Sequence, residues 1–322
     1  MKDNIGRKGL VLGIILLFVG AGVIPSTVSV IEEKIAFTSS ISPGYIQGLI
    51  DNASDGDTIY IPNGTYYENI IINKTISLIG EDENTTIIDS GGTVGDVVYI
   101  SADWVNISGF TIRNGLNGIE IESNYSTIHN NMIFNNYCGI YLVGTSYNNI
   151  KENSITSNKG NGISVVNSYY NTIKGNTITS NTDNGISLRL SDYNTIIGNT
   201  ISNENNGVYV GGSNENNISG NIISDNKYGV LIRFLIIWQH AFLSRNNTIT
   251  KNNFLGNRPH AYCGGDWSNK WIGNYWNRPR TLPKLIFGLI FIGFYGFVGI
   301  VIAIPWISFD TKPAKELYEI GV

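Results

Sequence analysis

The 322-residue chain has little of several features that mark common classes of protein. It contains only two cysteines, too few for a small fold held together by disulfides. Its 21 lysines and arginines are scattered and form no basic stripe, which argues against nucleic acid as a partner. Its glycines form neither a phosphate-binding loop nor a dinucleotide fingerprint, and no cofactor site is evident. With 42% hydrophobic residues, however, the chain has enough apolar side chains for a large core.

The sequence instead contains a repeat of 21 to 23 residues between Trp104 and Asn257. Each unit opens on an isoleucine and has a second apolar residue five positions later. An asparagine stands three positions after the isoleucine in every unit but the first, which has Phe110, and a glycine follows in the first six units. The opening residues are Ile107, Ile128, Ile150, Ile173, Ile196, Ile218 and Ile249. The asparagines are Asn131, Asn153, Asn176, Asn199, Asn221 and Asn252, and the glycines are Gly118, Gly139, Gly162, Gly185, Gly207 and Gly229. A fixed period of this kind outranks local propensity as an indicator of fold.

The units favour strands over helices, because β-branched apolar residues alternate with polar neighbours. At ~3.3 Å per residue, a unit of about 22 residues holds three short strands and three bends, so stacked units form an all-β solenoid, the parallel β-helix. The isoleucines would fill its interior, and the asparagines would bond from rung to rung at one bend. The glycines would stand at another bend, which needs a positive φ or a close backbone approach. A leucine-rich repeat is the alternative for this period, but its Leu-x-x-Leu-x-Leu frame is absent.

The flanking segments complete the expected domain order. Residues 1–30 combine a basic start with an apolar run, which predicts a secretory signal peptide or an N-terminal anchor. Residues 41–56 are predicted to contain a short amphipathic helix that caps the first rung. The β-helix would then occupy residues 57–280, and residues 281–322 would form an apolar tail.

Two apolar segments depart from the repeat. The run Leu285–Ile307 carries no charge over 23 residues, which is long enough to span a bilayer, but it contains four glycines and many β-branched and aromatic residues. It is predicted to be either a membrane anchor or an apolar hairpin that caps the last rung. The run Leu231–Leu243 lengthens the sixth unit, as a longer loop over the flank or as a partner-binding loop around Trp238.

Two stretches of the sequence carry a family resemblance. The run from Ile46 to Asp89, IQGLIDNASDGDTIYIPNGTYYENIIINKTISLIGEDENTTIID, resembles the opening of the NosD-like secreted β-helix proteins, which have CASH-type repeats. The stretch FLGNRPHAYCGGDWSNKWIG and the NYW at Asn274–Trp276 resemble that family's closing rungs. The resemblance implies right-handed winding and export. It also implies either a role in copper-enzyme maturation or an association with polysaccharides.

The residues themselves predict no metal site. Copper prefers thiolate, thioether and imidazole ligands, and the weak candidates are His260 and Cys263, which fall in one rung. No His/Cys cluster with a recognised spacing accompanies them, and Cys263 aligns with an inward apolar position. Copper as a cofactor is therefore implied by the resemblance alone.

A candidate binding strip follows from the register of the repeat. On the strand after each glycine, Tyr141 and Tyr209 take one outward column, and Arg189 and Arg233 take the next. The two tyrosines would lie three rungs apart, ~14 Å along the ladder, which is the length of a short oligosaccharide. Aromatic faces suit sugar rings, and guanidinium groups suit carboxylates or phosphates.

A catalytic site is not expected on this strip. Glu120 and Glu122 share one strand face, but no neighbouring rung supplies another carboxylate in their columns. A glycosidase needs two carboxylates that flank the scissile bond. The sequence therefore predicts an exported cell-surface β-helix that binds or displays polysaccharide without catalysis. The alternatives are an accessory protein for copper-enzyme maturation and a polysaccharide lyase, epimerase or hydrolase.

Overall fold

The computed structural model describes residues 44–237, 240–264, 266, 268–294 and 300–320. The predicted signal segment, residues 1–30, and Trp238 lie outside the described residues. The described part of Phe37–Val322 is built from strands and one helix, α1 (Tyr45–Asn52). The predicted class, an all-β parallel β-helix, is confirmed.

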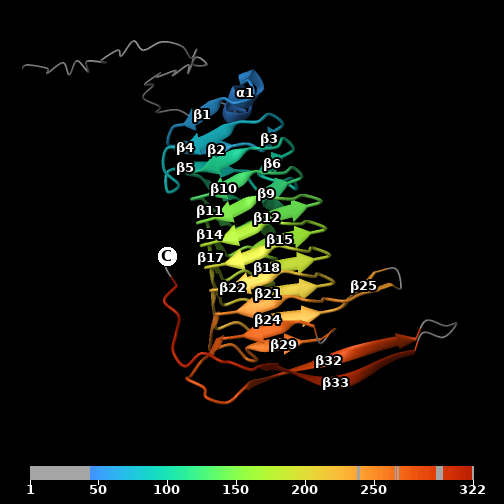
Figure 1. Ribbon diagram of the computed structural model, residues 1–322. Helices are drawn as coiled ribbons and strands as arrows, with labels where there is room; N and C mark the ends of the chain where they lie inside the picture. The colour runs from blue at the N-terminus through green and yellow to red at the C-terminus, as the bar shows by residue number, and fades with distance from the viewer. Residues whose placement is uncertain (1–43, 238–239, 265, 267, 295–299, 321–322) are drawn as a thin grey trace, which may run out of the picture. The chain divides into compact units, whose positions relative to one another are not determined.

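The strands form three long sheets, and each rung supplies one strand to each sheet in turn (Figure 1). Sheet A has the order β1 (Thr58–Ile61), β4 (Ser77–Gly80), β7 (Asn106–Ser108), β10 (Thr127–His129), β13 (Asn149–Lys151), β16 (Thr172–Lys174), β19 (Thr195–Ile197), β22 (Asn217–Ser219), β27 (Thr248–Thr250), β30 (Lys270–Ile272), β33 (Ile300–Asp310) and β32 (Lys284–Phe294). Sheet B has the order β2 (Gly64–Tyr67), β5 (Thr86–Asp89), β8 (Thr111–Arg113), β11 (Met132–Phe134), β14 (Ser154–Thr156), β17 (Thr177–Thr179), β20 (Thr200–Ser202), β23 (Ile222–Ser224), β28 (Asn253–Leu255) and β31 (Tyr275–Trp276). Sheet C has the order β3 (Ile70–Ile72), β6 (Val98–Ile100), β9 (Asn117–Ile121), β12 (Cys138–Val143), β15 (Ile163–Val166), β18 (Asn184–Arg189), β21 (Asn206–Gly211), β24 (Tyr228–Arg233) and β29 (Ala261–Cys263).

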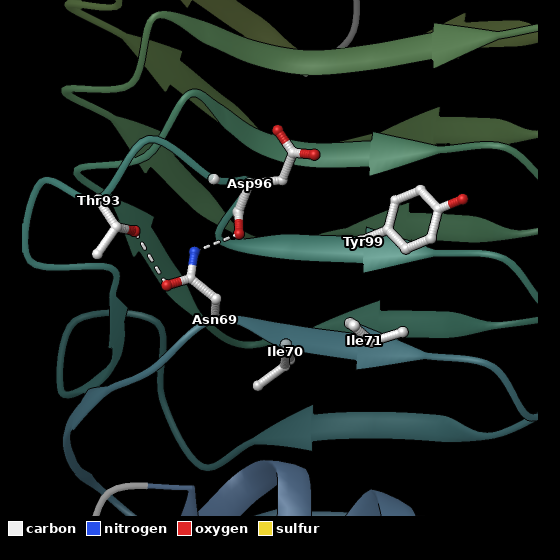
Figure 2. A pocket seen from close by; sticks show the side chains of 7 residues that line it. Asn69, Ile70, Ile71, Thr93, Asp96 and Tyr99 are labelled. Carbon is white, nitrogen blue, oxygen red and sulfur yellow. Dashed lines mark hydrogen bonds between the residues drawn. The ribbon is translucent and has the colours of Figure 1, made fainter.

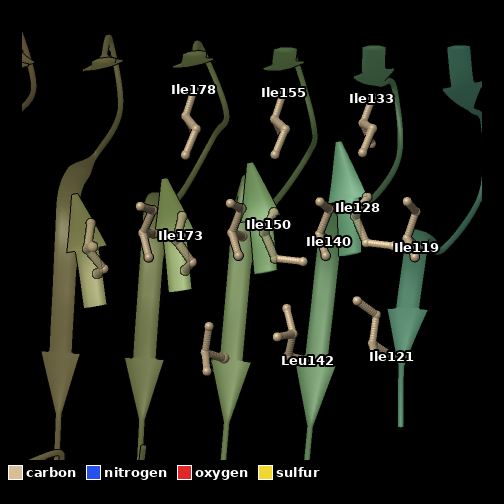
Figure 3. Close-up of a cluster of buried hydrophobic side chains, with 14 of the residues drawn as sticks. Ile119, Ile121, Ile128, Ile133, Ile140, Leu142, Ile150, Ile155, Ile173 and Ile178 are labelled. Carbon is tan, nitrogen blue, oxygen red and sulfur yellow. The ribbon is translucent and has the colours of Figure 1, made fainter. Parts of the chain in front are cut away.

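The isoleucine columns fill the interior, as predicted. Ile128 on β10 pairs in register with Ile107 on one side and with Ile150 on the other. All three side chains are fully buried, and Figure 3 shows the same stacking for the neighbouring columns. Burying one such side chain contributes ~1.5–3 kcal/mol, so the repetition of these columns supplies most of the stability of the solenoid.

The helix α1 covers the first rung. Its Ile46 and Ile50 are fully buried in the core, and the backbone N–H groups of Ile46 and Gln47 donate to the Glu68 carboxylate. At its other end Lys74 Nζ donates to the carbonyls of Ile50, Asp51 and Ala53, where the negative end of the helix dipole favours a cation. The predicted capping helix is present, over a shorter span than residues 41–56.

The asparagines form hydrogen-bonded rows that run along the solenoid. In the predicted row, Asn153 Nδ2 donates to Asn176 Oδ1 at 3.0 Å, and Asn176 Nδ2 donates to Asn199 Oδ1 at 3.0 Å. The full row is Asn131, Asn153, Asn176, Asn199, Asn221, Asn252 and Asn274, and it ends on Asp310.

Two further rows were not predicted. One, five residues later in each unit, is Asn136, Asn158, Asn181, Glu204, Asn226 and Asn257. The other is Asn148, Asn171, Asn194, Asn216, Asn247 and Asn269. Asn181 is buried in the second row, where its side-chain amide donates to Glu204 Oε1 at 3.0 Å.

Five of the six repeated glycines lie in strands, and Gly162 directly precedes β15, which corrects half of their interpretation. Gly139, for example, lies within β12. A Cβ on Gly139 would stand 2.7 Å from Ile155 Cγ2 and 2.5 Å from the carbonyl oxygen of Gly162. Close approach between rungs, not a positive φ, therefore requires glycine in this column.

The apolar tail forms a hairpin of β32 and β33 that packs on the last rung. Ile286 is buried in the core, and Lys284 Nζ stands 5.9 Å from the centre of the Trp276 ring. The buried carboxylate of Asp310 accepts hydrogen bonds from Asn274 Nδ2 and Trp276 Nε1. Among the described residues, no helix is both long and apolar enough to cross a membrane.

The insertion in the sixth unit is a short hairpin at the edge of sheet C. Its strands β25 (Leu235–Ile237) and β26 (His240–Phe242) pair antiparallel. The β-carbons of Leu235 and Phe242 come so close to Gly212 that a Cβ on this glycine would lie 3.2 Å and 2.9 Å from them. The base of the hairpin therefore lies beside Gly212, directly after β21, and the hairpin projects away from the solenoid (Figure 1).

Candidate functional site

The outer face of sheet C carries the predicted strip, in the predicted register. One outward column pairs Tyr141 with Ser164 and Ser187 with Tyr209 across neighbouring rungs. The next column pairs Arg189 with Gly211 and Gly211 with Arg233.

Three of the four predicted residues line one depression of about 350 Å³ at β18, β21 and β24. They are Arg189, Tyr209 and Arg233, joined by Lys227 and Asp183 among other lining residues. Both arginines are exposed, and neither forms an ion pair with a carboxylate among the described residues. The depression therefore presents guanidinium groups with free hydrogen-bond donors beside an aromatic ring.

Tyr141 lies outside this depression. Burial raises its pKa, the Glu120 carboxyl adds to the rise, and the positive charge of Arg189 opposes it. Tyr141 thus stands between two groups of opposite sign on one face, with Glu120 towards the first rungs and Arg189 towards the last.

An acidic group on the same face was missed from the sequence. Asp96, in the segment before β6, lies against Glu120 although it belongs to neither outward column, so a second carboxyl reaches Glu120 from outside the columns. Burial and the adjacent Asp96 carboxyl, which shares a hydrogen bond with Glu120, together raise the pKa of Glu120 to about 7, while the hydrogen bond from Asn117 opposes the rise. Asn117 holds both carboxyls, since its N–H donates to Asp96 and its side chain donates to Glu120. Near neutral pH the Glu120 carboxyl can therefore carry or release a proton.

A second depression of about 380 Å³ adjoins this acidic group. Its lining includes Asp96, Tyr99, Asn69 and Thr93, which Figure 2 shows on adjoining strands and loops. Asn69 donates to the backbone carbonyl of Asp96 and accepts from Thr93. Beside it, Tyr99 donates to Glu122 at 2.6 Å.

A stack of exposed aromatic rings runs along the corner before sheet A. It was not predicted from the sequence. Its members are Trp104, Tyr125, Tyr147, Tyr170 and Tyr193. Neighbouring ring centres are 4.4 to 5.2 Å apart and the planes differ by 3 to 9°. The spacing was readable, because each ring comes three residues before an opening isoleucine. Each ring covers the faces of its neighbours, so the interior rings offer only their edges to a ligand.

The candidate copper ligands do not fit a copper site. Among the described residues, no group of three or more His, Cys, Asp and Glu side chains is arranged to hold a metal ion. Burial raises the pKa of the Cys263 thiol to about 11 and lowers the pKa of His260 to about 4. Cys263 and Cys138 are both free and buried. A buried thiol that resists ionisation is a poor copper ligand, because the thiolate is the form that binds metal.

The three parallel sheets define the class of the protein, which is a right-handed parallel β-solenoid. Residues 50–282 match the family described as periplasmic copper-binding protein (NosD). The chain belongs to the NosD family.

A curated relative and solved structures agree with this class. A cell surface glycoprotein of Methanothermus fervidus is 39% identical over 93 residues, which are 28% of this chain and 15% of the relative. An alginate lyase from a Paenibacillus species has a TM-score of 0.58 at 17% identity, over 71% of this chain and 92% of its own. The tailspike protein 2 of bacteriophage CBA120 has a TM-score of 0.59 at 13% identity, over 76% of this chain and 40% of its own. The two structural similarities concern the fold alone.

Proposed function

We propose that the protein is an exported, cell-surface β-solenoid that binds polysaccharide on the outer face of sheet C without modifying it. The observation that carries the proposal is the depression in which Tyr209 lies with Arg189 and Arg233, whose guanidinium groups form no ion pair among the described residues. Export is supported by the periplasmic designation of the family and by the cell-surface name of the curated relative. A polysaccharide ligand is supported by the alginate lyase among the structures with the same fold. Attachment to a membrane through the apolar tail remains a prediction.

Calorimetric titration of the full-length chain with acidic and neutral polysaccharides tests the proposal. The double variant Arg189→Ala/Tyr209→Ala is expected to bind its polysaccharide at least about tenfold more weakly, because it loses a charge-assisted contact and the aromatic platform. Its melting temperature should not change, since Arg189 is exposed and Tyr209 lies on the outer face.

The matched control is Tyr60→Ala/Lys174→Ala, which removes one exposed tyrosine and one exposed cation from sheet A. It should bind as the unaltered protein does. Equal weakening in both double variants would show that binding depends on overall charge and not on sheet C.

A second candidate function, acid–base chemistry on a glycan, is favoured by the Asp96–Glu120 pair. Carboxylates of glycoside hydrolases stand ~5 Å or more apart, so two carboxyls that share a hydrogen bond do not suit hydrolysis. They suit a lyase or an epimerase, in which one group takes up and returns a proton.

If the pair is catalytic, the chain should form unsaturated chain ends or inverted sugar centres in an acidic polysaccharide, seen by ultraviolet absorbance or NMR. Glu120→Gln should then slow the reaction ~100-fold, as the loss of a general acid or base does. Glu122→Gln, on the same strand face but exposed, is the control. Absence of product, or an unchanged rate in Glu120→Gln, contradicts this candidate.

A further inference from the structure

The floor of the depression at β18, β21 and β24 is the ring of Tyr209. Gly211 is the next outward position on β21, and a Cβ there would stand 2.7 Å from the Tyr209 ring and hydroxyl. The ring therefore lies down over Gly211 instead of standing away from the sheet. Arg189 and Arg233 are the register partners of Gly211 on the two neighbouring strands. The aromatic ring is thus set between two arginines, and the Arg189 guanidinium carbon lies over the ring, 5.6 Å from its centre, a position that it leaves when a sugar ring stacks there.

A buried hydrogen-bond acceptor without a donor also lines this depression. Asn184 donates to Asn161, and Asn206 donates to Asn184 at 2.7 Å, so the three amides form a short row. The next rung has Tyr228 at this position, which ends the row. The Oδ1 of Asn206 is left with no partner, although Asn206 is only 6% exposed. A buried acceptor without a donor is unfavourable, and a ligand hydroxyl can pair with it once a lining side chain moves aside to expose it.

The charge of the depression favours an anion. Arg189, Arg233 and Lys227 line it with three positive charges, and Asp183 lines it with one negative charge. The two arginines start two rungs apart, ~10 Å along the ladder, a gap that two arginine side chains can close on one carboxylate. Its volume of about 350 Å³ is at the small end of ligand sites, which suits one or two sugar residues.

We propose that this depression is a subsite for a uronic acid residue, and the inference rests on the proposed polysaccharide binding. The sugar ring lies on Tyr209, its carboxylate lies between Arg189 and Arg233, and a ring hydroxyl donates to Asn206 Oδ1. A uronate combines an apolar ring face, a carboxylate and hydroxyl donors in one residue, so it fits all three features at once. A free sulfate or phosphate ion satisfies the arginines but offers no ring face to Tyr209, whereas a sulfated sugar offers both and is the competing ligand.

Three polymers distinguish these ligands in calorimetry with the full-length chain: polygalacturonate, the same polymer with its carboxyls reduced to alcohols, and dextran sulfate. Polygalacturonate is expected to bind at least about tenfold more tightly than either of the others. Arg233→Ala should weaken polygalacturonate about tenfold and leave binding of the reduced polymer unchanged. Lys174→Ala, an exposed cation on sheet A, should leave both unchanged.

Gly211→Ala tests the platform separately from the charges. A methyl group at this position displaces the Tyr209 ring, so binding of polygalacturonate should weaken while both arginines remain. Equal binding of native and reduced polymer overturns the uronate subsite and leaves polysaccharide binding in place. Equal binding of dextran sulfate overturns it in favour of a general polyanion surface. No binding of any polymer overturns both the subsite and the proposed function.

Discussion

Replacing Asn176 by alanine is expected to lower the free energy of unfolding by about 4 kcal/mol. The Asn176 amide donates to the carbonyl of Ile150 at 2.8 Å and to Asn199 Oδ1 at 3.0 Å. Its own oxygen accepts from the backbone and the side chain of Asn153, both at 3.0 Å. Alanine leaves these buried groups unpaired, and each costs ~1–3 kcal/mol. Urea denaturation followed by circular dichroism measures the change.

Asn84→Ala is the control, because Asn84 is exposed and outside the three rows. Its free energy of unfolding should stay within about 0.5 kcal/mol of that of the unaltered protein. Asn181→Ala should be destabilising as well, since Asn181 is equally enclosed in the second row. If Asn176→Ala and Asn84→Ala have the same denaturation midpoint, the asparagine row does not stabilise the protein.

Replacing Glu204 by glutamine is expected to stabilise the protein by roughly 3 kcal/mol at pH 8 and to have little effect at pH 4. Glu204 takes an asparagine's place in the second row, where it accepts from Asn181 at 3.0 Å. Its Oε2 is buried without a partner, whereas the amide nitrogens of Asn181 and Asn226 in the same row donate to backbone carbonyls. Glutamine supplies the missing N–H donor and carries no charge.

The pH dependence follows from the same burial, which raises the pKa of Glu204 from 4.5 to about 7. Between these values the folded protein binds a proton that the unfolded chain has released, so stability falls as pH rises from about 4.5 to 7 and stays lower above. Glu204→Gln removes this fall. Comparing the two proteins at each pH cancels the contributions of other groups, and Glu152→Gln, at an exposed position, is the control. A stability difference that does not change with pH would contradict a protonated Glu204.

The interior and the strip were predictable because they repeat. Ile128 and Ile150 recur at one period, so their inward register could be read directly, and Tyr209 and Arg189 followed as outward neighbours. The strand β2 was missed, because it belongs to an irregular early rung that has no column to compare with. Gly139 was assigned to a bend, because a sequence shows that glycine is required but not which close contact requires it.

Two features of the site could not be predicted from a linear pattern. Asp96 lies in an irregular segment before β6 and belongs to no column, so its contact with Glu120 appears only in three dimensions. The position of the Tyr209 ring over Gly211 depends on side-chain direction, which the period does not specify. The unpaired oxygen of Asn206 likewise depends on where a short row of amides happens to end.

The central claim is that sheet C holds a glycan at Arg189, Tyr209 and Arg233. A crystal structure of the full-length chain with a galacturonate tetrasaccharide tests it most directly. We expect a sugar ring against the Tyr209 ring, its carboxylate within hydrogen-bonding distance of Arg189 or Arg233, and a hydroxyl bonded to Asn206 Oδ1. An ordered tetrasaccharide on sheet A, on sheet B or along the Trp104–Tyr193 aromatic stack, with the sheet C depression empty, would contradict it.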